Sequence, residues 1–279
     1  MADTSPSLPV QAQVSGSSFY AGMRVLPKAE RDAMYAIYGF CREVDDIADD
    51  EQGSRAERAV ALDAWRNDIE SLYAGGAPGR AAPVADAVKR FGLLKADFLA
   101  VIDGMAMDVA GDIRWPPLAT LDLYCDRVAS AVGRLSVRIF GMDEEPGIAL
   151  AFHLGRALQL TNILRDIDED SAIGRVYLPA EPLLNAGIVF TTPPEVVADP
   201  RIEGACRQLA ALAHQHYDAA TAILAQRPRG HLIAPRLMAA IYVRILRRME
   251  AAGWTAPRHR IRIGKATLIL TVLRLSLFR

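Results

Sequence analysis

The chain has 279 residues, of which 51% are hydrophobic, and this is enough to bury one large core or two small ones. Its net charge of −1 provides no electrostatic footprint for nucleic acid, so we expect no nucleic-acid partner. Residues 1–13 lack the features of a secretory signal, and no run reaches the ~18 apolar residues of a transmembrane helix. Three widely spaced cysteines form no metal pattern and favour reduced thiols in a cytoplasmic protein.

The first half of the chain predicts helices separated by glycine and proline. Residues 1–14 are expected to form a loosely held tail, and a short helix begins within Ser15–Tyr20 and ends before Pro27. Apolar residues then recur at helical spacing. The helices predicted from this periodicity are 27–50, 57–73 and 83–110, with interruptions near Gly92 and Gly104.

The second half continues the helical pattern. In the helix predicted over 118–140, Gly133 costs ~1 kcal/mol against alanine, so a close approach of another element would explain it. A central helix is expected over 146–168, and the proline-rich stretch 176–200 predicts a connection with one short helix. No strand alternation and no repeat is visible, which indicates an all-α, single-domain protein. The remaining predicted segments are helices over 201–226 and 232–252, a basic loop over 257–265 and an apolar helix over 266–279.

The stretch Gln159–Asp170 carries the strongest chemical signal in the chain. Positions four apart share one face of a helix, so Asn162, Asp166 and Asp170 form a polar column with Gln159 one turn earlier. Two carboxylates ~5 Å apart at an effective dielectric of ~20 repel by roughly 3 kcal/mol. This column therefore requires a nearby cation.

A second acidic pair, Asp45 and Asp49, repeats the same spacing upstream. If the two helices face each other, four carboxylates line one cavity, and hard oxygen ligands of this kind suit Mg²⁺. A single acidic pair on a helix is usually a solvated face, but each pair here follows an apolar run, 36–41 or 158–164. The apolar context favours a metal site.

These segments resemble the squalene/phytoene synthase family over about residues 15–265. The resemblance rests on the two aspartate segments and on the sequences Tyr124–Gly133 and Gly174–Pro179. Residues 16–27 and 33–38 are most similar to the members that form presqualene diphosphate. The family implies an isoprenoid-synthase-type helical bundle, occupying residues 15–265, around a central cavity.

The resemblance implies a head-to-head condensation of two farnesyl diphosphates for squalene and hopanoid biosynthesis. Ionisation assisted by two or three Mg²⁺ ions gives an allylic cation, which a double bond of the second molecule attacks. Proton loss then closes the cyclopropane of presqualene diphosphate, and either a tyrosine hydroxyl or the released diphosphate takes the proton. NADPH is not expected as a cofactor.

The family also implies roles for particular residues. Arginine forks pair with phosphate oxygens, and aromatic faces attract carbocations, although a tyrosine on an apolar helix face is more often core packing. The expected metal ligands are Asp45, Asp49, Asp166, Asp170 and Asn162, and Tyr124 joins the four aspartates as a catalytic residue. The expected substrate-binding residues are Ser18, Phe19, Tyr38, Arg42, Gln159, Asn162, Arg165, Arg175, Tyr177, Tyr242 and Arg260.

Three other functions fit parts of the sequence: a phytoene or dehydrosqualene synthase, a non-catalytic assembly-factor relative, and a structural helical protein docked on a membrane. Retention of all four aspartates favours an active enzyme. Residues 266–279 are expected either to attach to the inner face of the membrane, steered by Arg258, Arg260 and Arg262, or to pack on the protein's own core. Downstream hopanoid-pathway enzymes are further expected partners.

Overall fold

The computed structural model describes residues 23–24, 26–50, 52–262, 264 and 271. Within these residues all regular secondary structure is helical, apart from one isolated bridge between Arg114 and Val176, which confirms the all-α prediction. The predicted N-terminal tail, the C-terminal helix over 266–279 and the site residues Ser18 and Phe19 lie outside the described residues. The α-helices are α3 Lys28–Ala48, α4 Arg55–Tyr73, α5 Ala82–Phe91, α6 Lys95–Ala110, α7 Leu118–Cys125, α8 Ala131–Ile139, α9 Glu144–Arg165, α10 Ile167–Ala172, α11 Ala180–Asn185, α12 Pro193–Ala198, α13 Ile202–Ala225 and α14 Ile233–Ala252.

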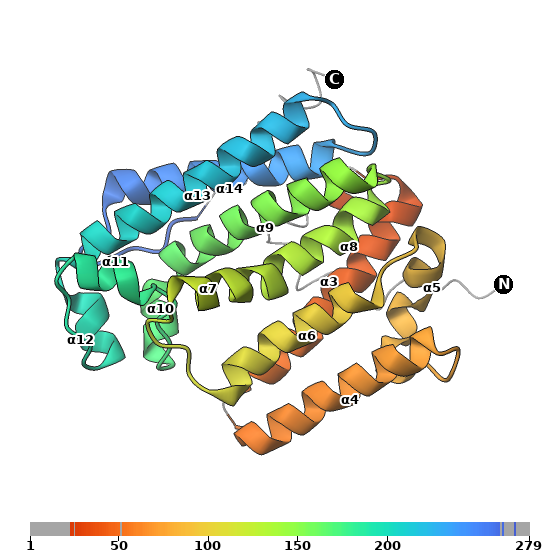
Figure 1. Ribbon diagram of the computed structural model, residues 1–279, viewed down its shortest axis with the longest axis horizontal. Helices are drawn as coiled ribbons and strands as arrows, with labels where there is room; N and C mark the ends of the chain where they lie inside the picture. Colours follow the sequence, from red (N-terminus) through yellow and green to blue (C-terminus); the bar gives the residue numbers. More distant parts are fainter. Residues whose placement is uncertain (1–22, 25, 51, 263, 265–270, 272–279) are drawn as a thin grey trace.

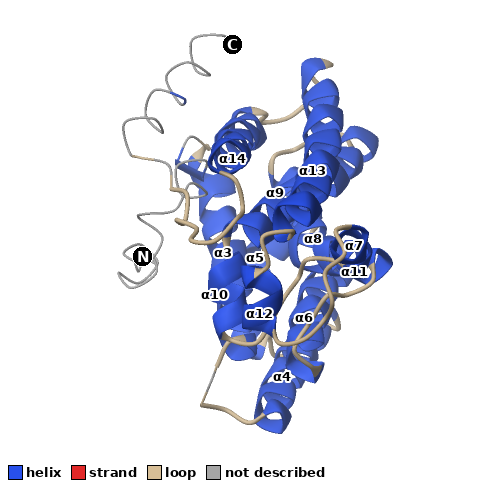
Figure 2. Ribbon diagram, turned by 90° about the vertical axis from the view of Figure 1, so that its left-hand side faces the viewer, coloured by secondary structure: helices blue, strands red, loops and turns tan. Residues whose placement is uncertain are grey.

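Helix α9 occupies the middle of the bundle, with α13 and α14 on one side and α8 on the other (Figure 1). Helices α3, α4 and α6 form the opposite part of the molecule, where α4 packs against α6. Figure 2 shows the same order from the side, with α13 and α14 in the upper part and α4 at the bottom. Helix α8 joins the two parts because Leu135 and Ile139 pack toward α3 and α6 while Val137 packs toward α9.

Periodic apolar residues account for how α3 packs. Proline 27 precedes the first turn, and the buried residues then recur three or four positions apart, so one stripe faces the core. The charged residues Arg42 and Asp46 lie off this stripe and are exposed. The stripe consists of Ala33, Met34, Ile37, Phe40, Val44 and Ala48.

Two glycines predicted as helix interruptions behave differently. Gly92 ends α5 in the left-handed conformation, with φ of 60°, and this confirms the first interruption. Gly104 lies inside the unbroken helix α6, so the second prediction is wrong. A Cβ atom at Gly104 would lie 2.6 Å from Cγ1 of Val128, so the glycine is needed for close packing rather than for a break.

The region 118–139 is one helical rod that contains a π-helical turn, Asp126–Ser130, between α7 and α8. The close approach predicted at Gly133 is confirmed, because a Cβ atom there would lie 3.0 Å from the Cβ of Ala151 on α9. At Gly155 the contact is tighter, since a Cβ atom would lie 2.7 Å from both Cα and N of Ser130. Small residues therefore let the backbones of α8, α9 and the π-helical turn touch.

The central helix is shorter than predicted. Helix α9 ends at Arg165, and Asp166 leaves helical geometry with φ of −105° and ψ of 19° before α10 begins. The indole Nε1–H of Trp254 donates to the carbonyl of Leu164 at 3.0 Å, which satisfies one carbonyl at the helix end. The backbone N–H of Asp170 still donates to the carbonyl of Asp166 at 2.8 Å, so the two aspartates keep the spacing of one turn.

The connection over 176–200 contains two short helices, α11 and α12, where one was predicted. Proline begins or immediately precedes both helices, because its fixed φ suits the first helical turn. In α12, Thr192 and Glu195 form a capping box, and this pairing is visible in the sequence.

The tight contact at Gly155 predicts a clear effect on stability. Gly155→Ala should lower stability by about 1–3 kcal/mol, because the added methyl group meets backbone atoms that cannot move aside. Gly39→Ala is the matched control, since no atom lies within 4 Å of its added Cβ, and alanine favours a helix by up to about 1 kcal/mol. Thermal unfolding of both variants tests this, and equal midpoints would contradict the close approach.

Candidate active site

Both predicted acidic pairs lie where a helix ends. Asp45 is in the last turn of α3, and Asp49 follows it, its backbone N–H donating to the carbonyl of Asp45 at 3.0 Å. Asp166 directly follows α9, and Asp170 lies on α10. The C-terminus of a helix carries a partial negative charge, so carboxylates are unfavourable there without a cation.

Arg175 supplies positive charge to the first pair. One guanidinium nitrogen donates to Oδ1 of Asp49 at 2.7 Å, and the other donates to the carbonyl of Ala48, the last residue of α3, at 3.1 Å. Arg175 is only 7% exposed, so little water competes for these bonds. Arg42 pairs with the other member, at 3.2 Å from Nη1 to Oδ2 of Asp45.

Two arginines hold Asp166 of the second pair. Arg165 binds both carboxylate oxygens through Nε and Nη2, at 2.8 and 2.6 Å, and Nε of Arg260 donates to Oδ1 at 2.8 Å. The side chain of Tyr242 hydrogen-bonds to Arg165. The arginines that sequence analysis predicted as diphosphate ligands are thus gathered at the acidic pairs.

The remaining carboxylates of the two pairs have altered proton affinity. Burial, followed by the neighbouring Asp49, raises the pKa of Asp45 to about 6. Burial, followed by the neighbouring Asp166, raises the pKa of Asp170 to about 7. Negative charge on Asp108 contributes to both increases, which places this one residue near both pairs.

Asp108 is the principal residue that sequence analysis missed. It lies on α6, is 4% exposed and accepts a hydrogen bond at each oxygen, from the hydroxyl of Tyr177 at 2.6 Å and from that of Tyr124 at 3.0 Å. The two rings stack with centroids 5.0 Å apart. The available signal was an acidic residue in the apolar run 105–110, where a charge is rarely buried without partners.

Asn162 provides an observation that bears on metal binding. Its Nδ2 lies 3.5 Å from Oε1 of Gln159, whereas its Oδ1 is buried and has no hydrogen-bond partner. An unsatisfied buried acceptor of this kind costs about 1–3 kcal/mol, and a cation at this position would satisfy it. The oxygen-only donor set around it suits Mg²⁺.

No group of three or more His, Cys, Asp or Glu side chains within the described residues is arranged to hold a metal ion. The four aspartates are instead arranged as separate pairs, each in contact with arginine. Such pairs fit Mg²⁺ bound through one or two carboxylates, with its other positions taken by water and substrate phosphate.

The other predicted residues lie at the edge of this site or outside it. Tyr38 lies near Arg42 and Asp45, and burial raises its pKa. Arg258 was expected to face lipid, but its side chain is only 9% exposed and binds Asp168 and the carbonyls of Trp254 and Val197. The prediction that Arg258 steers membrane attachment is therefore wrong, because its charge is already paired inside the protein.

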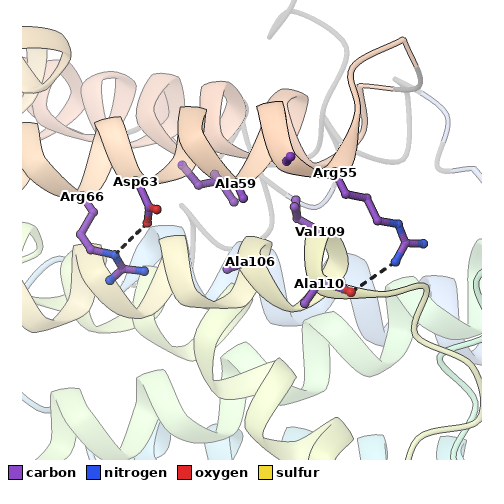
Figure 3. Close-up of a pocket in the computed structure, with 9 residues that line it drawn as sticks. Arg55, Ala59, Asp63, Arg66, Ala106, Val109 and Ala110 are labelled. Carbon is purple, nitrogen blue, oxygen red and sulfur yellow. Dashed lines mark hydrogen bonds and ion pairs between the residues drawn. The ribbon is translucent and has the colours of Figure 1, made fainter.

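A pocket of about 420 Å³ lies between α4 and α6, apart from the acidic pairs (Figure 3). Arg55 donates to the carbonyl of Ala110 at one end, and Arg66 lies 3.7 Å from Asp63 at the other. Its wall between these pairs is apolar and includes Ala59, Ala106 and Val109. The concentration of paired charges instead marks the region around Asp108 as the candidate active site.

Comparisons with known proteins identify the family of this chain. The family model described as squalene/phytoene synthase matches residues 12–267. A presqualene diphosphate synthase of Zymomonas mobilis subsp. mobilis is 62% identical, over 95% of this chain and 92% of its own. A second, of Rhodopseudomonas palustris, is 52% identical over 96% of this chain and 95% of its own.

Solved structures show the same fold. A dehydrosqualene synthase in complex with ligand superposes with a TM-score of 0.83 at 23% identity, covering 97% of this chain and 95% of its own. The squalene synthase HpnC from Alicyclobacillus acidocaldarius superposes with a TM-score of 0.74 at 26% identity, covering 88% and 94%. These similarities confirm the predicted isoprenoid-synthase-type bundle.

The raised pKa of Asp170 predicts how stability depends on pH in Mg²⁺-free protein. An unfolded aspartate titrates near pH 3.9, so the folded state binds this proton more tightly and loses the associated stability as pH rises through about 7. Asp170→Asn should therefore raise the unfolding midpoint at pH 8 and leave it nearly unchanged at pH 4. The expected gain is about 1–2 kcal/mol after screening by water.

Thermal unfolding in the presence of a chelator tests this expectation. Asp32→Asn is the control, because Asp32 forms only an exposed pair with Lys28. A pH dependence in Asp170→Asn identical to that of the unmodified protein would contradict the electrostatic description of the site.

Proposed function

The chain belongs to the squalene/phytoene synthase family, and we propose that it condenses two farnesyl diphosphates head to head into presqualene diphosphate. Diphosphate is released, and the product serves squalene and hopanoid biosynthesis. The observation that carries this proposal is the pair of acidic helix ends, each bound to arginine, around the buried Asp108. The relatives that share 62% and 52% identity over nearly the whole chain bear the name presqualene diphosphate synthase.

Asp45, Asp49, Asp166 and Asp170, together with Oδ1 of Asn162, would hold Mg²⁺ in this reaction. The metal supplies positive charge that stabilises the departing diphosphate. The unsatisfied oxygen of Asn162 and the carboxylate oxygens of the acidic pairs support this assignment. The separation of the carboxylates into two pairs would allow two or three ions to be held, as the family resemblance implies.

The arginines of the site bind and orient the diphosphate groups. In the free protein Arg165 and Arg260 both hold Asp166, while Arg42 and Arg175 hold Asp45 and Asp49. A guanidinium fork binds phosphate oxygens as readily as carboxylate oxygens, so these side chains can transfer from aspartate to substrate. The carboxylates then become available to cations.

Tyrosine and apolar side chains protect the allylic cation. Tyr124 and Tyr177 are each 6% exposed, and their stacked rings present aromatic faces close to the acidic pairs. An aromatic face attracts a cation, and a site closed to water prevents its capture as an alcohol. Neither role requires NADPH, which we do not expect as a cofactor.

A phytoene synthase is the alternative within the family. The phytoene synthase of Mycobacterium tuberculosis is 37% identical over 63% of this chain and 57% of its own, a shorter and weaker match than those above. A non-catalytic assembly factor would not need four aspartates and their arginines. The enzyme reading therefore has the stronger support.

We propose a cytoplasmic location, because all three cysteines are free thiols, with downstream hopanoid-pathway enzymes as partners. In the part of the chain that the structure describes, no helix is long and apolar enough to cross a membrane. Peripheral attachment through residues 266–279 remains a prediction.

Substitution of one aspartate from each pair tests the metal assignment. Asp45→Asn and Asp166→Asn should each lower turnover by about 100-fold or more, because charge on the departing diphosphate loses its stabilisation. Their stabilities should differ in Mg²⁺-free protein: Asp45→Asn relieves repulsion, whereas Asp166→Asn leaves Arg165 without its carboxylate. Diphosphate release and thermal unfolding measure the two effects.

Asp32→Asn, on the same helix as Asp45, serves as the control for these variants and should retain full turnover. Near-normal diphosphate release in Asp45→Asn or Asp166→Asn would rule out the proposed metal ligands.

Product analysis tests the proposed reaction itself. Purified protein incubated with farnesyl diphosphate and Mg²⁺ should accumulate presqualene diphosphate and stop there, because the proposed reaction ends at the cyclopropane. Addition of NADPH should leave the product unchanged. Squalene formation on that addition, or efficient phytoene formation from geranylgeranyl diphosphate, would refute the proposal.

A further inference from the structure

The arrangement of Asp108, Tyr124 and Tyr177 is more specific than cation stabilisation requires. Aromatic faces alone would attract a cation, yet the hydroxyls of Tyr177 and Tyr124 both donate to the carboxylate of Asp108, at 2.6 and 3.0 Å. Asp108 is 4% exposed and lies on α6, whereas the tyrosines come from α7 and from the segment after α10. Three separate parts of the chain thus converge on one buried acceptor.

A phenol can accept a proton only if it passes its own proton on. Each tyrosine hydroxyl has one hydrogen, and here that hydrogen is donated to Asp108. The oxygen lone pairs are therefore the part of each hydroxyl that can accept a proton, and the two hydroxyls also interact with each other. Burial raises the pKa of both tyrosines, so neither exists as a ready phenolate base.

The released diphosphate is the competing proton acceptor. At this site its oxygens would be surrounded by Arg42, Arg165, Arg175 and Arg260. Positive neighbours lower the proton affinity of an anion, so the bound diphosphate becomes a weaker base than diphosphate in water. Burial raises the pKa of Asp108 above that of an ordinary aspartate, and this effect exceeds the opposing effects of the hydrogen bond from Tyr177, the charge of Arg175 and the hydrogen bond from Tyr124.

We propose that Asp108 is the final acceptor of the proton lost when the cyclopropane closes, and that a tyrosine bound to it relays the proton. This inference rests on the proposed function. The C–H bond at C1 of the first farnesyl group breaks, and its electron pair forms the last bond of the three-membered ring. The proton moves to a tyrosine oxygen while that tyrosine's own proton moves to Asp108. The carboxylate becomes a neutral acid, the tyrosine is unchanged, and solvent removes the proton after product release.

The ratio of two products tests the relay. In the unmodified protein each presqualene diphosphate should be accompanied by one diphosphate. Asp108→Asn keeps the size and one oxygen acceptor of the side chain but cannot take the proton, so ionisation continues while ring closure fails. We expect presqualene diphosphate per diphosphate released to fall at least tenfold, with farnesol and other products of the uncaptured cation making up the difference.

Asp97→Asn is the matched control, because Asp97 is also 4% exposed on α6 but pairs with Arg134. A substitution that only damages the structure lowers presqualene diphosphate and diphosphate together, so their ratio stays at one. This is the result expected for the control. If Asp108→Asn does not fold, the double variant Tyr124→Phe/Tyr177→Phe removes the relay and should show the same fall. A ratio of one in whichever of these variants folds would overturn the proposal and identify diphosphate as the base.

The same measurements distinguish an error in the proposed function from an error in the relay. If unmodified protein forms no presqualene diphosphate from farnesyl diphosphate, the reaction assignment is wrong. If it forms this product at the expected ratio and the Asp108 variant does so too, only the relay is wrong.

Discussion

Negative charge at the ends of two helices is the constraint on which the site depends. Asp45 and Asp49 lie at the end of α3, where the helix dipole already disfavours carboxylates, and Asp166 and Asp170 lie between the end of α9 and the first turn of α10. Burial adds to the cost, as the raised pKa values of Asp45 and Asp170 indicate. A protein keeps such an arrangement when a cationic ligand offsets it in function.

Arginines stabilise the free protein against this charge. The guanidinium of Arg175 binds both Asp49 and the last carbonyl of α3, so one side chain stabilises two negative groups. Arg165 and Arg260 enclose Asp166 in the same manner. Since these groups also recognise phosphate, the contacts that stabilise the free protein are the ones that substrate would exchange.

The scaffold holds the two helix ends together through close backbone packing and a C-terminal segment. Gly133 and Gly155 let α9 touch α8 and the π-helical turn. Trp254 donates to the end of α9, and Arg258 fixes Asp168 of α10 while binding the carbonyl of Trp254. The chain after α14 thus supports the acidic residues from outside.

Local pattern in the sequence determined the helices and the two acidic pairs, because helical spacing and apolar periodicity need only neighbouring residues, whereas the arginines of the site were predicted from the family resemblance. Local pattern also identified Gly133 as a close approach. Only the tertiary structure decided where α9 ends, since Trp254 and Arg260 come from distant positions. Only the tertiary structure shows that Gly104 is a site of close packing rather than a helix break, and that Arg258 pairs with Asp168. Asp108 remained hidden for the same reason: its partners Tyr124 and Tyr177 are 16 and 69 residues away, and only folding brings them to it.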